Sequence, residues 1–573
     1  MNKINKSAYG IFEAAIKLIY TRFFYFSFAC FLFILLFSFD GYSQNKYIVY
    51  FKDKGTKKNY DTPEKLLSSK AIERRNQQGI LMDDDDMPVN VQYLNELSSA
   101  GCKLLSTSKW LNSTSITTVL SPQELQQRFV FIKQIVSVKD TSVKYESSPK
   151  YLEQKTNLNY SKIASTIDYG QANTQNTMLG IECLHKDGYT GKNTTIAVID
   201  GGFLGADTMR AFDSLRIQKR IIGAFDFVAN DSFPYRMDEH GAGVLSVITA
   251  NLPGQMVGIA PHAKFLLART ITFGNYDIHA DEYLWIRAME WADSSGADII
   301  STSLGWSNYY GGGDTNYTYA NMDGRTTIVT KGASIASRKG IIVVASAGNQ
   351  GNKSWHYISA PCDGDSVLCV GAVDYTKTHS YFSSYGPSYD GRIKPDVMAM
   401  GQSVKVVWPG TSGVTSMNGT SFSAPLIAGL TACLKQKHPG STNMEVINAI
   451  IQSADRYSNP DFTYGNGIPN ACTADSLLTN INEIKNNSTL NFQLYPNPAH
   501  NELQYEIGSI EKTTLQIRII NILGQIVINE TKNIDKGISN HTLNISELSS
   551  GSYVLQIITD SGTDTRQKQF LIK

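Results

Sequence analysis

The sequence predicts an α/β protein built on a mostly parallel, doubly wound sheet, with a small α+β unit before it and an all-β unit after it. Three observations lead to this prediction. Residues 179–474 alternate short apolar strands with helical patterns, residues 45–146 mix short strands and helices, and residues 490–573 contain strands of alternating polarity. The chain of 573 residues is too long for one hydrophobic core, because a domain averages roughly 100–200 residues.

Residues 1–44 have the order of a secretory signal peptide. Scattered lysines precede the apolar run 23–39, and small and polar residues follow it at once. We therefore expect cleavage near Gln44. The alternative is a retained membrane anchor, because the run approaches the roughly 17–25 residues that a spanning helix needs. No later segment is as long and apolar, so no permanent membrane span is expected after processing.

The region 45–146 is predicted to be a compact α+β unit with mostly antiparallel pairing. Its expected strands are 47–51, 103–108, 114–120 and 132–139, and its expected helices are 63–75, 91–100 and 122–128. Residues 147–178 are polar and are interpreted as a linker and the start of a mature chain, with a processing site.

The region 179–474 carries the parallel sheet. Its strands are apolar along their whole length, which is typical of parallel strands covered on both faces, and helix 281–294 is a crossover. The expected strands are 195–199, 265–270, 299–303, 341–345 and 367–373.

A polar linker, 475–489, is expected before the last region. Residues 490–573 are predicted to form an all-β, immunoglobulin-like sandwich, because turn residues separate short alternating strands. These strands are 503–507, 514–520, 526–529, 541–544 and 552–559.

Charge and cysteine content narrow the class of protein. With 52 basic and 51 acidic residues, the chain lacks the positive surplus of a nucleic-acid binder, so no nucleic-acid partner is expected. The seven cysteines form no dense disulfide framework. Only Cys362 and Cys369 lie close in sequence, and a bridge and two free thiols are equally compatible with that spacing.

Three residues have sequence surroundings suited to catalysis. Asp200 ends strand 195–199 and precedes two glycines, at the edge where parallel sheets bind ligands. His240 precedes a helix of small residues, which leave its ring accessible. Ser421 lies at a helix start, near unpaired backbone N–H groups, although an N-cap role is the common alternative. Pro425 breaks the helical pattern just after it, which favours a functional segment.

The order Asp200, His240, Ser421, with Gly-Thr-Ser-Phe-Ser-Ala-Pro at 419–425, resembles the subtilisin-type serine peptidases. Further matching segments occur in the family's order across about 300 residues, among them 258–261, 370–373 and 382–387. The resemblance implies a catalytic triad of these three residues, with Asn349 as an oxyanion donor. The residues that it implies for substrate binding are Ser303, Leu304, Gly305, Ala347 and Gly348.

The implied activity is hydrolysis of peptide bonds in proteins through an acyl-enzyme on Ser421. Two departures are Gly201, where the family commonly has Ser or Thr, and Ala242, where it commonly has Thr. They support the alternative, a catalytically impaired scaffold used for surface binding or adhesion. A lipase or esterase is excluded, because no Gly-x-Ser-x-Gly elbow surrounds Ser421. No cofactor is expected to be required, and no carboxylate spacing locates the structural calcium that is frequent in this family.

The flanking regions also resemble known domains. The unit 45–146, between a signal peptide and a peptidase, resembles the family's propeptide, and the alternative is an accessory domain that stays attached. The unit 490–573, with Leu-Tyr-Pro-Asn-Pro at 494–498, resembles the sorting domain of type IX secretion. This resemblance implies export through the periplasm to the outer-membrane surface or the exterior, with the secretion machinery as partner and proteins or peptides as substrates.

Overall fold

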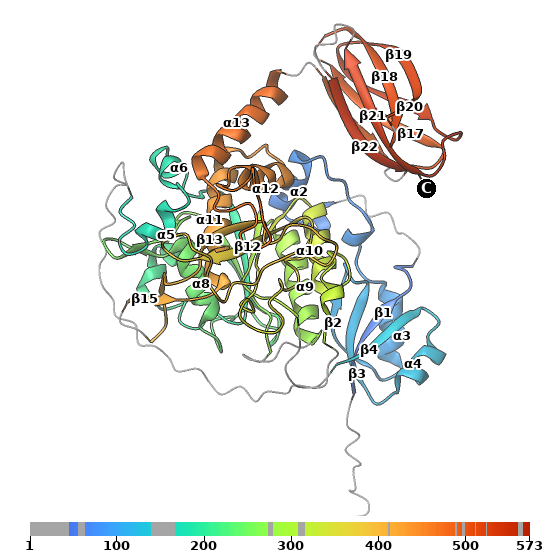
Figure 1. The fold of residues 1–573 in the computed structure, drawn as a ribbon. Coiled ribbons are helices and arrows are strands. Elements are labelled where there is room, and N and C mark those ends of the chain that lie inside the picture. Colours follow the sequence, from blue (N-terminus) through green and yellow to red (C-terminus); the bar gives the residue numbers. More distant parts are fainter. Residues whose placement is uncertain are drawn as a thin grey trace, which may run out of the picture.

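A computed structural model shows three regions in chain order, a small α+β domain, a central α/β domain and a β-sandwich (Figure 1). The predicted signal peptide, residues 1–44, lies outside the described residues, as do residues 147–166 of the predicted linker 147–178. The structure describes residues 45–55, 63–138, 167–272, 279–307, 316–410, 413–487, 490–495, 499–509, 511–522, 524–559 and 565–572.

The central domain is built on a parallel sheet, as predicted. Among the described residues this sheet has seven strands in the order β13-β12-β11-β10-β5-β9-β6, and each neighbouring pair is parallel. The pattern did not reveal β6 or β13, because β6 is a half-exposed edge strand and β13 has four residues. The strands are β5 (Thr195–Asp200), β6 (Ile221–Asp226), β9 (Lys264–Arg269), β10 (Ile299–Thr302), β11 (Ile342–Ser346), β12 (Val367–Val373) and β13 (Val397–Met400).

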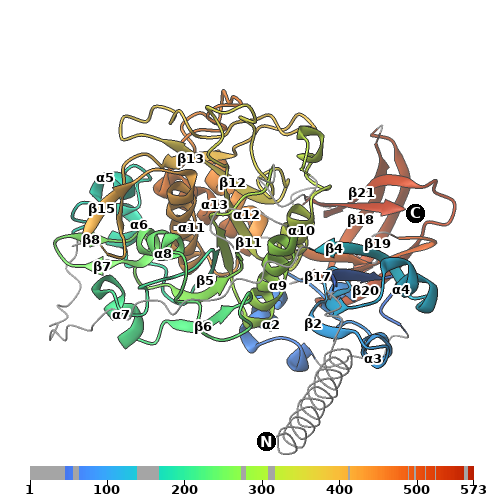
Figure 2. The same ribbon diagram turned by 90° about the horizontal axis from the view of Figure 1, so that it is seen from below.

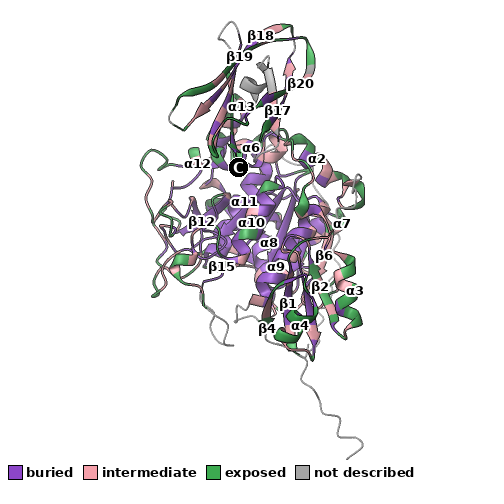
Figure 3. Ribbon diagram, turned by 90° about the vertical axis from the view of Figure 1, so that its right-hand side faces the viewer, coloured by how far each residue is buried: buried purple, intermediate pink, exposed green. Residues whose placement is uncertain are grey.

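Helices cover both faces of this sheet. The helices α8 (His240–Thr249) and α11 (Thr420–Lys437) pack on one face, and α9 (His279–Ser295) and α10 (Ile328–Arg338) on the other. Figure 3 shows the buried residues gathered on these four helices. The smaller elements are α5 (Asn173–Thr177), α6 (Glu182–Lys186), η3 (Arg210–Phe212), α7 (Asp213–Ile217), β7 (Asn251–Leu252), β8 (Met256–Val257), η4 (Tyr319–Asn321), β14 (Val404–Val407), β15 (Val414–Met417) and α12 (Asn443–Gln452).

The strand order reverses beside β5. After β5 the chain forms the edge strand β6, returns to form β9 between β6 and β5, and then crosses to β10 on the other side of β5. Ile199 pairs with Thr302, so Asp200 and Ser303 emerge side by side at the carboxyl edge. In open α/β sheets ligands bind at such a switch point, because the two strands lead their loops apart there.

Within residues 45–55 and 63–138, the N-terminal domain contains a four-stranded antiparallel sheet in the order β2-β3-β1-β4. The predicted helix 63–75 is wrong in its bounds, because Ser68 accepts a hydrogen bond from the Ala71 N–H and starts a new helix. The elements are β1 (Asn45–Phe51), η1 (Pro63–Lys65), α2 (Ser69–Gln77), η2 (Asp84–Asp86), α3 (Val91–Ser99), β2 (Lys103–Ser108), β3 (Ser113–Thr118), α4 (Pro122–Arg128) and β4 (Ile132–Val138).

The C-terminal region forms two antiparallel sheets around one apolar core, in the orders β16-β17-β20 and β19-β18-β21-β22 within the described residues. It lies beyond the end of α13 (Figure 1). Its strands are β16 (Leu490–Tyr495), β17 (Glu502–Ser509), β18 (Thr513–Asn521), β19 (Ile526–Ile534), β20 (Gly537–Asn544), β21 (Gly551–Thr559) and β22 (Thr565–Ile572).

The segment predicted as the linker 475–489 is helical over most of its length. Helix α13 (Ala471–Asn487) runs through it, and its first turns pack on the central domain through Ala474 and Leu478. A disulfide between Cys183 and Cys472, which the sequence did not predict, ties α13 to α6 across 289 residues. The central domain therefore extends beyond the predicted boundary at residue 474.

Candidate active site

The side chains of Asp200 and His240 meet at the carboxyl edge of the sheet. Asp200 is the last residue of β5 and is fully buried, while His240 is the first residue of α8. The His240 Nδ1–H donates to Asp200 Oδ1 across 2.8 Å. Gly241 permits this approach, because a Cβ there would lie 2.3 Å from the Gly202 carbonyl oxygen. The contact fixes which imidazole nitrogen carries the proton and leaves Nε2 for another partner.

The electrostatics of this pair favour a charged imidazole. Burial opposes the charge on His240, but the attraction and hydrogen bond of Asp200, with a further contribution from Asp238, raise the pKa of His240 to about 9. The neutral form, which can accept a proton, therefore becomes dominant only at alkaline pH.

Asp238 occupies the space that a side chain at position 201 would take. A Cβ on Gly201 would lie 2.8 Å from Asp238 Oδ2, and Asp238 Oδ1 accepts the His240 backbone N–H at 2.9 Å. The departure at Gly201 is thus matched by a carboxylate from the neighbouring loop. The Oδ2 atom of Asp200 is buried and has no protein hydrogen-bond partner within the described part of the chain.

The buried side chain of Arg269, at the end of β9, supports the turn after Asp200. Its Nε donates to the Gly201 carbonyl at 3.1 Å, and its guanidinium pairs with Asp226 at 2.7 Å. Because Asp226 balances its charge, Arg269 can hold this turn without an uncompensated buried charge.

Ser421 is the second residue of α11, and Gly419 takes the N-cap position, so the N-cap reading of Ser421 is wrong. The Ser303 hydroxyl donates to the Ser421 carbonyl at 2.8 Å, and the Ser421 hydroxyl donates to the Ser303 carbonyl at 3.4 Å. Pro425, four residues on, has no N–H for the Ser421 carbonyl, which leaves that carbonyl to Ser303. The proline therefore allows the residue that follows β10, Ser303, to hydrogen-bond to α11 at the Ser421 carbonyl.

His240 lies close to the helical turn that contains Ser421. Its ring centroid is 5.8 Å from that of Phe422. The helices α8 and α11 pack on each other, and a Cβ on Gly243 of α8 would lie 3.5 Å from the Phe422 ring of α11 and 2.6 Å from the ring of Trp408, which follows β14. The structure thus brings the regions of Asp200, His240 and Ser421 together from three different elements.

Asn349 follows β11 and its side chain is held by Thr420. Its Oδ1 accepts from the Thr420 backbone N–H at 2.9 Å and from the Thr420 hydroxyl at 3.1 Å. A backbone N–H can only donate, which identifies Oδ1 and directs the amide NH₂ elsewhere. Asn349 is an exposed residue, and Thr420, which holds its Oδ1, immediately precedes Ser421, so the side-chain amide lies beside the start of α11.

The remaining predicted binding residues surround a side chain that the sequence did not single out. A Cβ on Gly305 would lie 3.0 Å from the Ser359 Cβ, and one on Gly348 would lie 2.8 Å from the Ser359 Oγ. The Ser359 N–H also donates to the Ala347 carbonyl at 3.0 Å. Ser359 therefore lies between Gly305 and Gly348, and Leu304 is half-buried beside them.

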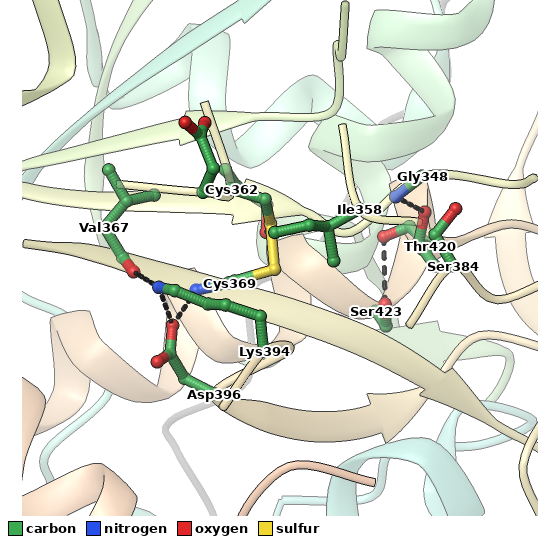
Figure 4. Close-up of a disulfide and its surroundings, with 12 residues drawn as sticks. Gly348, Ile358, Cys362, Val367, Cys369, Ser384, Lys394, Asp396, Thr420 and Ser423 are labelled. Carbon is green, nitrogen blue, oxygen red and sulfur yellow. Dashed lines mark hydrogen bonds and ion pairs between the residues drawn. A yellow bond between two sulfur atoms is a disulfide. The ribbon is translucent and has the colours of Figure 1, made fainter. Parts of the chain in front are cut away.

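A disulfide braces the segment that follows Ser359. Cys362 and Cys369 are bonded, with their Cα atoms 4.9 Å apart, which answers the question that their spacing left open. Figure 4 shows this bridge with Lys394 and Asp396 beside it. Asp396 Oδ2 accepts from the Cys369 N–H at 2.7 Å and pairs with the Lys394 ammonium. The bridge joins the segment to β12.

Comparison with known proteins identifies the class of protein that this fold and site define. The subtilase family model matches residues 191–467, a Bacteroidota propeptide model of the same peptidase class matches 46–157, and a secretion-system C-terminal sorting model matches 493–573. Subtilisin NAT of Bacillus subtilis subsp. natto is 30% identical over 360 residues, which cover 61% of this chain and 83% of that relative. The chain belongs to the subtilase family.

A second curated relative agrees in class. The subtilisin of Bacillus pumilus is 33% identical over 296 residues, which cover 51% of this chain and 94% of that one. Among solved structures, proteases from Pseudoalteromonas arctica are 20% identical, with a TM-score of 0.41 and coverage of 55% of this chain and 99% of theirs.

The protein is thus a subtilisin-like serine endopeptidase with a propeptide domain and a type IX sorting domain, exported to the cell surface or beyond. In the described ranges no helix is long and apolar enough to cross a membrane. No group of three or more metal-ligating His, Cys, Asp or Glu side chains occurs among the described residues.

Proposed function

We propose that this endopeptidase cuts protein chains with Ser421 as nucleophile, His240 as general base and acid, and Asp200 as the group that orients His240. The observation that carries the proposal is the 2.8 Å hydrogen bond between Asp200 and His240 at the sheet edge where α11 presents Ser421. This combination matches the roles that peptide hydrolysis by a serine requires.

In the acylation step, the neutral His240 Nε2 takes the proton of the Ser421 hydroxyl as its oxygen attacks the peptide carbonyl carbon. The imidazolium formed is stabilised by Asp200 and then protonates the leaving amine. Deacylation repeats the sequence with water as the attacking group, and the serine hydroxyl is restored. Protein groups handle every proton and charge in these steps, so we propose that the chemistry itself requires no cofactor.

Two donors would stabilise the oxyanion of the tetrahedral intermediate, the Asn349 NH₂ group and the Ser421 backbone N–H. The Thr420 contacts support this role, because they hold Asn349 in one orientation before the substrate arrives. Donors fixed in advance need no reorganisation as the negative charge develops.

The backbone of Ser303, Leu304 and Gly305 would pair with the extended substrate, since β10 ends there at the switch point. The side chain before the scissile bond would enter between Gly305 and the Ala347–Gly348 segment, with Ser359 at its end. The Gly305 and Gly348 contacts support this assignment, because a larger side chain at either position would collide with Ser359.

The alternative of an impaired scaffold rested on Gly201 and Ala242. Asp238 fills the space at Gly201 and binds the His240 backbone, so the first departure leaves a supported histidine. We therefore favour the active enzyme. We also propose that the sandwich 490–573 is the part that contacts the type IX secretion machinery, in line with the sorting model that matches it.

The test is a Ser421→Ala variant of the exported protein, assayed on denatured casein. We expect kcat to fall by about 10⁶-fold, because the nucleophile is lost. The matched control is Ser423→Ala, which removes a buried hydroxyl bonded to the Thr420 carbonyl and should keep activity within tenfold. Equal activity of Ser421→Ala and the control would overturn the proposed nucleophile.

A further inference from the structure

A cluster of buried charges joins the propeptide domain to the catalytic domain at the edge of the sheet opposite the active site. Helix α2 of the propeptide domain packs on α9 (Figure 2). Two of the residues that it contacts, Ala297 and Lys339, come just before β10 and β11. Since both strands are parallel and the catalytic residues follow their carboxyl ends, this contact is separate from the cleft.

Adjacent arginines of α2 meet one carboxylate of α9. Arg74 pairs with Asp293 Oδ1 at 2.5 Å, and Arg75 pairs with Asp293 Oδ2 at 2.8 Å. The Arg74 guanidinium also donates to the carbonyls of Ala297 and Lys339. Both carboxylate oxygens of Asp293 are thus engaged by the propeptide domain, and the guanidinium of Arg74 caps the end of α10.

The turn η2 repeats the arrangement with the charges exchanged. Here the catalytic domain supplies the cation, Lys339, which pairs with Asp86 at 2.8 Å and also with Asp83. Asp86 in turn pairs with Arg75 at 2.8 Å, which links the two halves. The interface is therefore reciprocal, since each domain contributes both a cation and an anion.

A polar clamp lies beside the charges. The Gln78 side-chain NH₂ donates to the Gly340 carbonyl at 2.9 Å, and its Oε1 accepts the backbone N–H of Asn443, the first residue of α12, at 2.9 Å. The contact thus extends from α9 across α10 to α12.

The burial of this cluster determines its energetics. Asp293, Asp86 and Lys339 are fully buried, and Arg74 is 2% exposed. Removing one member would leave its partners charged in a dry interface, which is far more costly than losing a surface ion pair. Charged groups also suit a contact that must later open, because both surfaces are well solvated once separated.

We propose that α2 and η2 form an anchor that keeps the propeptide domain bound to the amino edge of the catalytic sheet after the chain between the two domains has been cut. The anchor selects a helix with adjacent arginines followed by a carboxylate turn, and it acts independently of the cleft. The inference rests on the propeptide and peptidase domains but not on the roles of Asp200, His240 and Ser421.

The experiment uses the full chain with Ser421→Ala and one recognition sequence for a site-specific protease inserted between residues 139 and 166. The chain is cut by the added protease, and the separation of the two fragments after dilution is followed by size-exclusion chromatography. Arg74→Met and Asp293→Asn test the two sides of the anchor. Arg128→Met, at an exposed arginine of the same domain, is the matched control.

We expect the parent and Arg128→Met fragments to stay together, and each anchor variant to separate at least about 100-fold faster. Thermal unfolding of the uncut chains checks folding, and Asp293→Asn carries the test if Arg74→Met does not fold. Separation within threefold of the control would overturn the anchor. Because the added protease makes the cut, the result does not depend on the peptidase mechanism; residual self-cleavage of the Ser421→Ala chain would contradict only the proposed nucleophile.

Discussion

The two buried carboxylates Asp200 and Asp293 differ in how completely they are bonded. Both oxygens of Asp293 are held by Arg74 and Arg75, whose charge is permanent. Asp200 binds His240 and the Gly201 N–H through Oδ1 alone, and its buried Oδ2 has no protein hydrogen-bond partner among the described residues. The first arrangement resists any change of charge, while the second lets His240 gain and lose a proton. A buried carboxylate thus serves two purposes in this molecule. With two arginines it holds two domains together, and with a histidine it supports the proposed proton transfer.

Replacing Asp200 gives the largest expected effect on the comparison. In Asp200→Asn the amide can donate to Nδ1 and favour the wrong imidazole tautomer, so kcat should fall by about 10⁴-fold. Steady-state kinetics on a peptide substrate measures it. Asp293→Asn in the processed enzyme, freed of its propeptide, should keep kcat within twofold, because that carboxylate acts only in the anchor. A loss below tenfold for Asp200→Asn would remove Asp200 from the mechanism.

Removal of the Asn349 side-chain donor is expected to have the second largest effect on kcat. Asn349→Ala should lower kcat by about 10²–10³-fold with little change in KM, since the oxyanion exists only near the transition state. Gln350→Ala, at the neighbouring residue, serves as the control for the loop. Equal changes in kcat for the two variants would show that Asn349 acts through loop structure alone.

The pH dependence of kcat/KM tests the charge environment of His240. Since the protonated imidazole cannot accept the Ser421 proton, and the pKa of His240 is raised to about 9, kcat/KM should rise with pH from neutrality to about that value. Kinetics between pH 6 and 10 measures the midpoint. A midpoint below pH 6.5, the ordinary value for histidine, would contradict the stabilisation of the imidazolium by Asp200 and Asp238.

Replacing Asp238 should shift the midpoint of the same pH profile by a smaller amount. Asp238→Asn removes one of the two carboxylates that raise the pKa of His240, so the midpoint should move to lower pH by a few tenths of a pH unit. Glu239→Gln, next in the chain, is the matched control and should shift it less. Equal shifts in both variants would mean that general surface charge, and not the position of Asp238, sets the midpoint.

The smallest effect concerns the carbonyl that Ser303 binds. Ser303→Ala leaves the Ser421 carbonyl without its side-chain donor and should lower the free energy of unfolding by about 1–2 kcal/mol. Pro425→Ala in the same chain supplies a backbone N–H and should recover part of that loss. Urea unfolding in the Ser421→Ala background, which avoids self-digestion, measures both. A double variant no more stable than Ser303→Ala would exclude this account of Pro425.

Local patterns predicted the parts of the molecule that depend on neighbours in sequence. The apolar strand 195–199 with Asp200 at its end, and the dense motif around Ser421, led to the sheet and to the candidate catalytic residues. Ser359 was missed because its importance comes from Gly305 and Gly348, which are distant in the chain. The pairing of Cys183 with Cys472 and the contact of Arg74 with Asp293 were missed for the same reason. The sequence 475–489, most of which forms α13, predicted a linker because it is polar.

The most direct test of the central claim is covalent labelling of the processed enzyme with a fluorophosphonate, followed by peptide mass mapping at a series of pH values. The account predicts one modification, on Ser421, with a rate that rises with pH as His240 loses its proton and that falls at least about 10³-fold in His240→Ala. Labelling of another residue, or a Ser421 rate that is unchanged by pH and by loss of His240, would contradict it.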